Sequence, residues 1–63
     1  MRNIQVGDVV CVRDEHLAPT KWPLARVVDV YPGQDGQVRV VTVRTSRGTY
    51  KRPVTKIVTL IRQ

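Results

Sequence analysis

Apolar residues along this chain fall in short β-branched runs rather than at helical spacing. No segment sustains a period of 3.6 residues, and Pro, Gly and Asp separate the runs. The pattern therefore predicts a chain of strands, with one helical turn over 54–57 before the last strand. The expected strands are Val9–Arg13, Leu24–Tyr31, Val38–Thr45, Thr49–Arg52 and Val58–Ile61.

Turn-forming residues mark the boundaries between these runs. Pro-Gly-Gln-Asp-Gly over 32–36 is expected to join the second and third strands. Ser46-Arg47-Gly48 has the composition of a tight hairpin loop, with Gly48 in a left-handed position. Pro53 has no N–H to donate, so it either ends the fourth strand or lies on an edge.

Five short strands without a true helix cannot bury their faces as a flat sheet. The sequence therefore predicts an all-β fold: a small five-stranded SH3-like barrel forming one domain over residues 1–63. An OB-fold is the alternative, although that fold usually needs more residues. Apolar doublets such as Val27-Val28 and Val40-Val41 serve both faces, and a slip of one residue would exchange the faces. The expected core residues are Val10, Val12, Leu24, Val28, Val30, Val40, Val54 and Ile57.

Composition agrees with a small β domain of 63 residues. Thirteen residues are Val and six are Thr, and the only aromatic residues are Trp22, Tyr31 and Tyr50. The single cysteine, Cys11, excludes an internal disulfide, and we expect it to be reduced, buried and metal-free. A reduced thiol suits a nuclear or cytoplasmic protein. No apolar run approaches the ~18 residues of a membrane span, and no signal-peptide pattern opens the chain.

Acidic and basic side chains are segregated along the chain. Residues 1–35 contain four basic and all five acidic residues, a charge of −1, whereas residues 36–63 contain seven basic residues and no acid, a charge of +7. A single-sign segment repels itself, so the pattern indicates a polyanionic partner, first of all nucleic acid. A basic surface that serves only solubility is the alternative.

The hairpin over 44–52 carries the densest group of basic residues. The expected centre of a nucleic-acid footprint consists of Arg44, Arg47, Lys51 and Arg52, and the additional candidates are Arg39, Lys56, Lys21 and Trp22. Arg39 and Arg44 fall on opposite faces of a strictly alternating strand. Trp22 either closes one end of the barrel or offers a stacking platform to a base, and Tyr31 and Tyr50 have the same two interpretations.

Catalytic chemistry finds little support in this sequence. His16 is the only histidine, its neighbours Asp14 and Glu15 lack metal-ligand spacing, and Ser46 lies in the expected hairpin loop rather than beside an oxyanion site. No Gly-rich phosphate loop followed by a helix is present. We therefore expect a binding domain rather than an enzyme, without a metal or a cofactor.

Three segments of the chain resemble one known family. The runs VGDVVCVRDE, KWPLARVVDVYPGQDGQVRVVTVRT and GTYKRPVTKIVTL are similar to the small C-terminal domain of Bel/Pao retrotransposon integrases, over about residues 4–61. The most specific parts are KWPLARV, YPGQDG with VRVVTVRT, and YKRPVTK. Ala25 stands where Gly is expected in such sequences, a departure that bears on backbone fit rather than on function.

The resemblance implies a fold similar to the SH3-like barrel of retroviral integrases, in which Gly-Asp and basic-Trp pairs recur as Gly7-Asp8 and Lys21-Trp22 do here. It implies nonspecific DNA binding and contacts with other integrase domains or subunits, with the catalytic core and a zinc-binding domain upstream. Two alternatives remain: a Tudor-like reader of chromatin proteins, with a cage built from the aromatic residues and Asp29 or Asp35, and an RNA-binding barrel with the rhythm of GDVVCV and LARVVDV.

Overall fold

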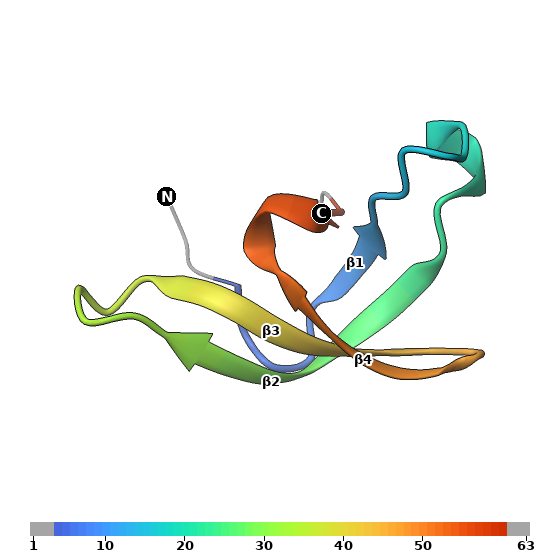
Figure 1. Ribbon diagram of the computed structural model, residues 1–63. Helices are drawn as coiled ribbons and strands as arrows, with labels where there is room; N and C mark the ends of the chain where they lie inside the picture. The colour runs from blue at the N-terminus through green and yellow to red at the C-terminus, as the bar shows by residue number, and fades with distance from the viewer. Residues whose placement is uncertain (1–3, 61–63) are drawn as a thin grey trace.

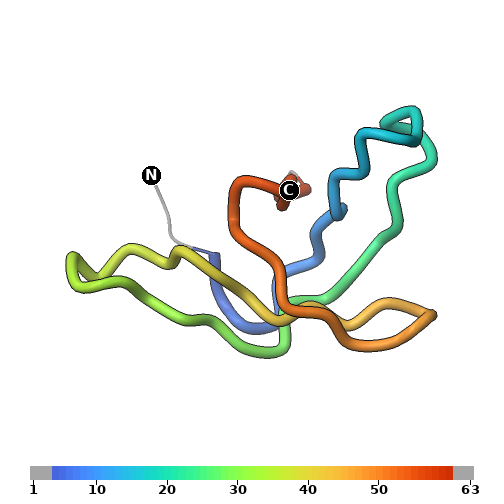
Figure 2. The backbone as a smooth tube through the Cα atoms, viewed as in Figure 1, coloured from blue at the N-terminus to red at the C-terminus, as the bar shows by residue number. Residues whose placement is uncertain are grey.

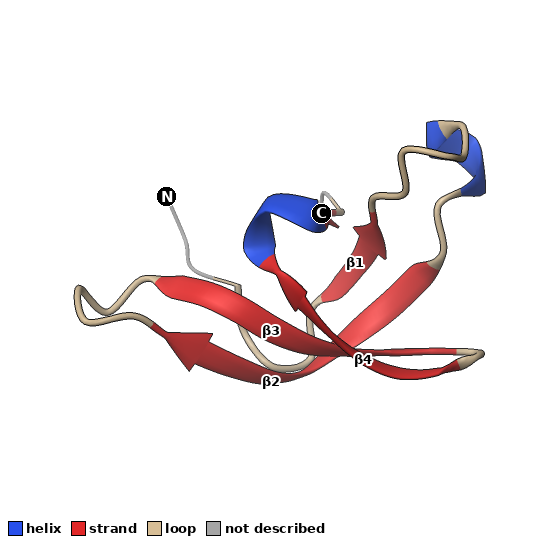
Figure 3. Ribbon diagram, in the orientation of Figure 1, coloured by secondary structure: helices blue, strands red, loops and turns tan. Residues whose placement is uncertain are grey.

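A computed structural model describes residues 4–60 and confirms the all-β architecture: five antiparallel strands form one sheet. The two short 3₁₀ turns, η1 (Pro19–Lys21) and η2 (Val54–Lys56), are the blue segments of Figure 3. The last strand begins one residue earlier than predicted, and its predicted end, Ile61, lies outside the described residues. The strands are β1 (Val9–Val12), β2 (Leu24–Pro32), β3 (Val38–Thr45), β4 (Gly48–Pro53) and β5 (Ile57–Thr59).

The strands follow the order β4-β3-β2-β1-β5 across the sheet. The sheet bends strongly, so that the chain leaves β4, turns through η2 and returns beside β1 in an SH3-like barrel (Figure 1). η2 packs against β3 and joins the two ends of the sheet, so a turn of the chain completes the barrel between β4 and β5. No helix within residues 4–60 has the length and apolar character needed to cross a membrane.

A β-bulge in β2 decides which side chains face inward. Val27 lies opposite Val43 and Asp29 lies opposite Thr42, so Val28 is the extra residue between the two pairs. A bulge bends its strand and shifts the alternation of side chains by one position. Val27 is consequently buried, whereas Val28 is 40% exposed.

The core lies inside the bend of the sheet. The prediction is confirmed for Val10, which is fully buried, and for four residues that pack around the core: Val12, Val30, Val54 and Ile57. It is wrong for Leu24, which is 61% exposed, and for Val28 and Val40, because the neighbouring member of each apolar pair faces inward instead. The buried core residues are Val10, Ala25, Val27, Val41 and Val43.

Cys11 is half-buried rather than buried. Its register partners are Leu24 of β2 and Val58 of β5, and both of these side chains are exposed on the outside of the barrel. The thiol therefore lies on the outer face of β1, because its neighbour Val10 takes the inward position.

The predicted hairpin turn between β3 and β4 is confirmed. Thr45 Oγ1 donates to the carbonyl oxygen of Gly48 (3.1 Å) and accepts from the backbone N–H of Arg47 (3.0 Å). Gly48 has a positive φ of 143°, a conformation that L side chains rarely adopt. Local turn chemistry thus sets the tip of this hairpin and the register Thr45↔Gly48 behind it.

Candidate nucleic-acid interface

The basic residues concentrate on the hairpin formed by β3, β4 and their turn, residues 38–53, which we call the basic hairpin. It contains five basic residues and no acid. Because side chains alternate along a strand, Lys51 and Arg52 point to opposite faces: Lys51 pairs with Thr42, and Arg52 pairs with the buried Val41. The structure therefore divides the predicted footprint between two surfaces.

The first surface lies on the outside of the barrel, and we call it the outer basic face. It consists of Arg26, Arg44 and Lys51, all of them exposed. Arg26 of β2 and Arg44 of β3 are direct cross-strand partners, and Lys51 lies on the same face of β4. Like charges placed directly opposite each other destabilise a sheet, so this arrangement costs folding stability.

Tyr31 and Asp29 border the outer basic face. The hydroxyl of Tyr31 lies 2.9 Å from Thr42 Oγ1 and donates to Asp29 Oδ2 at 3.5 Å. The other oxygen of Asp29 accepts from the backbone N–H of Val30 (2.9 Å). Lys51 Nζ lies 4.6 Å from the centre of the Tyr31 ring, a cation–π contact that positions this lysine beside the exposed ring.

The second surface is a groove of about 450 Å³ between the β1–β2 loop and the basic hairpin. Figure 2 shows both segments reaching toward the same side of the molecule. The hairpin contributes Arg47, Tyr50 and Arg52 to the groove, and the carbon of the Arg52 guanidinium lies 5.1 Å from the centre of the Tyr50 ring. The apolar part of the lining consists of Val12, Pro23 and Val43.

Trp22 holds the β1–β2 loop in place. Its indole N–H contacts two carbonyl oxygens of the loop, those of Asp14 (3.1 Å) and Leu17 (3.3 Å), and Arg13 lies over the ring at 5.9 Å. Trp22 is half-buried and does not line the groove. These contacts favour a structural role for Trp22 over that of an exposed stacking platform.

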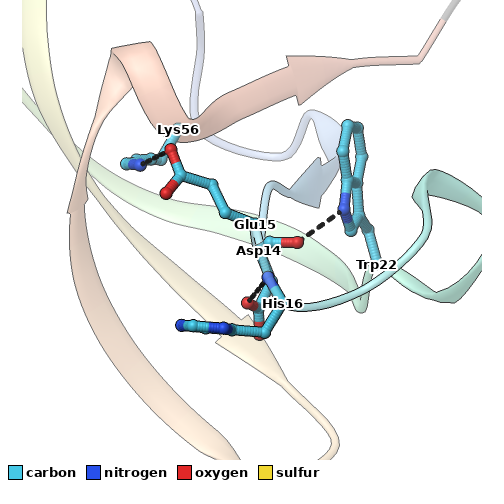
Figure 4. A network of polar contacts seen from close by, with 5 residues as sticks. All are labelled: Asp14, Glu15, His16, Trp22 and Lys56. Carbon is cyan, nitrogen blue, oxygen red and sulfur yellow. Dashed lines mark hydrogen bonds and ion pairs between the residues drawn. The ribbon is translucent and has the colours of Figure 1, made fainter.

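Glu15 and Lys56 connect the other side of this loop to η2. Lys56 Nζ lies 3.4 Å from Glu15 Oε2, and the backbone N–H of His16 donates to Asp14 Oδ1 (2.9 Å). Figure 4 shows Trp22 on one side of the loop and Glu15, His16 and Lys56 on the other. The loop wall of the groove is therefore held from both sides.

The remaining predicted site residues differ in how their charge is compensated. Arg39 pairs with Asp35 in the β2–β3 turn, and Lys56 pairs with Glu15; within residues 4–60 these are the ion pairs. The backbone N–H of Gln37 and then the charge of Arg39 hold the pKa of the Asp35 carboxyl below its ordinary value. Lys21 ends η1, which Figure 3 shows apart from the basic hairpin. The four residues at the centre of the predicted footprint therefore have no ion-pair partner within residues 4–60; they are Arg44, Arg47, Lys51 and Arg52.

Arg26 and the contact between Tyr50 and Arg52 were not part of the predicted interface. Arg26 lies in the acidic half of the chain and joins Arg44 only through the β2–β3 register. The i, i+2 spacing of Tyr50 and Arg52 does indicate a shared face once β4 is recognised, and the register shows that this face is the core side. Among residues 4–60, no three or more His, Cys, Asp or Glu side chains gather as a metal site would require.

The fold and the basic surfaces together define a small SH3-like barrel domain with two cationic faces. Residues 1–60 match the family model DUF5641, a family of unknown function, and the chain belongs to this family. No curated protein and no solved structure matches the chain.

Proposed function

We propose that this chain is the DNA-binding domain of a Bel/Pao-type retrotransposon integrase, where it supports DNA integration and assembly of the integrase. The observation that carries the proposal is the direct opposition of Arg26 and Arg44 on the outer basic face, beside Lys51. None of these three side chains forms an ion pair with a carboxylate of residues 4–60. The integrase context rests on the resemblance of the runs KWPLARV, YPGQDG and YKRPVTK.

The outer basic face lowers the stability of the free protein, and bound DNA removes this cost. A like-charged cross-strand pair destabilises a sheet, by an amount of the order of the ~0.2–1 kcal/mol that an opposite-charge pair contributes. Phosphates placed over Arg26 and Arg44 remove this repulsion and release condensed counterions from the DNA. The same charges form a convex barrel surface rather than an element shaped for a DNA groove, so the contacts position phosphates and carry little base specificity.

The geometry favours this proposal over a Tudor-like aromatic cage. Tyr31 lies on the outer face, Tyr50 lines the groove, and the N–H of Trp22 is engaged by carbonyls of the β1–β2 loop. A cage for a methylated lysine requires converging rings. The three rings lie in three separate places.

Fluorescence anisotropy of labelled duplex DNA of about 20 base pairs, over a series of salt concentrations, tests the proposal. The outer basic face together with Arg47 at the hairpin tip provides four charges that form no ion pair within residues 4–60, so log K should fall with log salt at a slope of about −3.6. The double variant Arg47→Glu/Lys51→Glu should bind every sequence at least about 30-fold more weakly at ~0.15 M salt, with a slope of about −1.8.

Arg13→Glu provides the matched control for these charge reversals. Arg13 is followed by Asp14 and Glu15 and lies over Trp22, so reversing its charge should weaken duplex binding less than reversing Lys51. A duplex affinity that does not change with salt concentration, or that is unchanged in the double variant, contradicts the proposal and indicates a protein partner instead. Competition with duplex RNA of the same length and with histone-tail peptides separates DNA binding from the two alternative functions.

A further inference from the structure

We infer that the groove between the β1–β2 loop and the basic hairpin binds an unpaired nucleotide, with the base stacked on the Tyr50–Arg52 pair. The inference rests on the proposed function and deepens it, because it assigns duplex DNA to the outer basic face and the hairpin tip, and an unpaired strand to the groove that begins at this tip. Tyr50 and Arg52 lie on the core side of β4, opposite to Lys51.

The size and lining of the groove suit one nucleotide. Its volume of about 450 Å³ lies within the ~300–1,000 Å³ of typical small-ligand sites. Val12, Pro23 and the Tyr50 ring provide the apolar contact that a base face requires. Bases of a duplex are stacked inside the helix, so a base that enters a recess comes from an unpaired or flipped nucleotide.

The charge of the lining suits a phosphate beside that base. Four cationic side chains and two carboxylates line the groove, which leaves a net charge of +2 with His16 neutral. Glu15 is paired with Lys56, and Asp14 accepts from the backbone N–H of His16, so both carboxylates already have partners. Arg47 and Arg52 form no ion pair within residues 4–60 and are the cations best placed to meet phosphate.

Tyr50 is held in position as a stacking platform. Its hydroxyl donates to the carbonyl oxygen of Arg47 (3.4 Å), and the Arg52 guanidinium lies over the ring at 5.1 Å. The side chain is nevertheless 39% exposed. Aromatic rings and guanidinium planes are the two groups on which proteins stack unpaired bases. The anchored loop wall opposite means that little conformational freedom is lost on binding.

A pair of strands that differ only in their bases tests the inference. An oligothymidylate of about eight nucleotides and an abasic strand of equal length carry the same phosphates. At ~0.15 M salt the 63-residue chain should bind the oligothymidylate at least about 5-fold more tightly, since a base stacked on an aromatic ring contributes about 1–3 kcal/mol. Equal affinity for the two strands overturns the inference.

Tyr31 is the matched control for Tyr50. Tyr31 is 37% exposed and also has a cation over its ring, but it lies on the outer face. Tyr50→Leu should abolish the preference for the base-bearing strand, Tyr50→Phe should keep it, and Tyr31→Leu should leave it unchanged. Equal losses for Tyr50→Leu and Tyr31→Leu contradict a site in the groove.

Two further measurements separate the possible outcomes. NMR titration of the unaltered chain with the oligothymidylate should shift the amides of Arg47 and Tyr50 more than those of Arg26 and Arg44; the reverse order overturns the inference even where Tyr50→Leu fails to fold. If the chain binds duplex DNA with the expected salt slope but binds the oligothymidylate and the abasic strand equally, this inference is wrong and the proposed function still holds. Absence of binding to duplex and strand alike removes the proposed function itself.

Discussion

Replacing Arg26 by Gln should stabilise the fold and weaken DNA binding at the same time. Gln keeps a long polar side chain on β2 but removes one of the two like charges that face each other in the pair Arg26↔Arg44. The relief of this repulsion should raise the free energy of unfolding by about 0.5 kcal/mol, the middle of the range for cross-strand charge pairs. For a chain of 63 residues this corresponds to a rise in Tm of about 4 °C.

The effect of the same substitution on binding has the opposite sign. Each phosphate contact contributes about 0.9 log units of affinity per log unit of salt, so losing one contact at ~0.15 M salt should weaken duplex binding about 5-fold. The slope of log K against log salt should change from about −3.6 to about −2.7.

Thermal melts at low salt and at ~1 M salt, together with anisotropy titrations, measure both effects. The gain in stability should disappear at ~1 M salt, where the Debye length is about 3 Å. Arg39→Gln is the control, because it removes a charge that is paired with Asp35 and should therefore bring no gain in stability. A Tm that is unchanged or lowered in Arg26→Gln, or an unchanged duplex affinity, would refute the reasoning that links charge repulsion to DNA binding.

Three further predictions concern the core, the β2–β3 turn and the β1–β2 loop. Val41→Ala should cost about 2 kcal/mol in urea unfolding, and Val40→Ala much less, because Val41 alone of the two is fully buried. Asp35 has a lowered pKa, so its contribution to stability is present above the ordinary carboxyl range and is lost as pH falls through its folded-state pKa; Asp35→Asn should remove this part of the pH dependence of urea midpoints. Trp22→Phe removes the indole N–H, so amide hydrogen exchange of Leu17 should accelerate while the exchange of Val41 stays slow.

The sequence alone determined where the strands and turns lie and that the surface charge of the second half of the chain is positive. β-Branched runs between Pro and Gly predicted the extent of Val38–Thr45 correctly and the ends of β2 and β4 to within one residue. These features depend on local chemistry: Gly48 adopts the positive φ that the hairpin turn requires, and Pro53 ends β4 because it cannot extend a ladder. The absence of acidic residues from residues 36–63 can be read from the sequence without knowing the fold, because net charge depends on composition alone.

Tertiary structure decided which face each of these residues occupies. In the doublets Val27-Val28 and Val40-Val41 the two neighbours are equally apolar, so alternation could not select the buried member, and the bulge after Val27 shifted the phase of β2. The opposition of Arg26 and Arg44 depends on register between strands, and the groove depends on a loop and a hairpin that meet only in the folded chain. Pairing and packing act between residues distant in sequence, whereas turn and strand propensities act between neighbours, and this difference separates what the sequence determined from what only the folded structure decided.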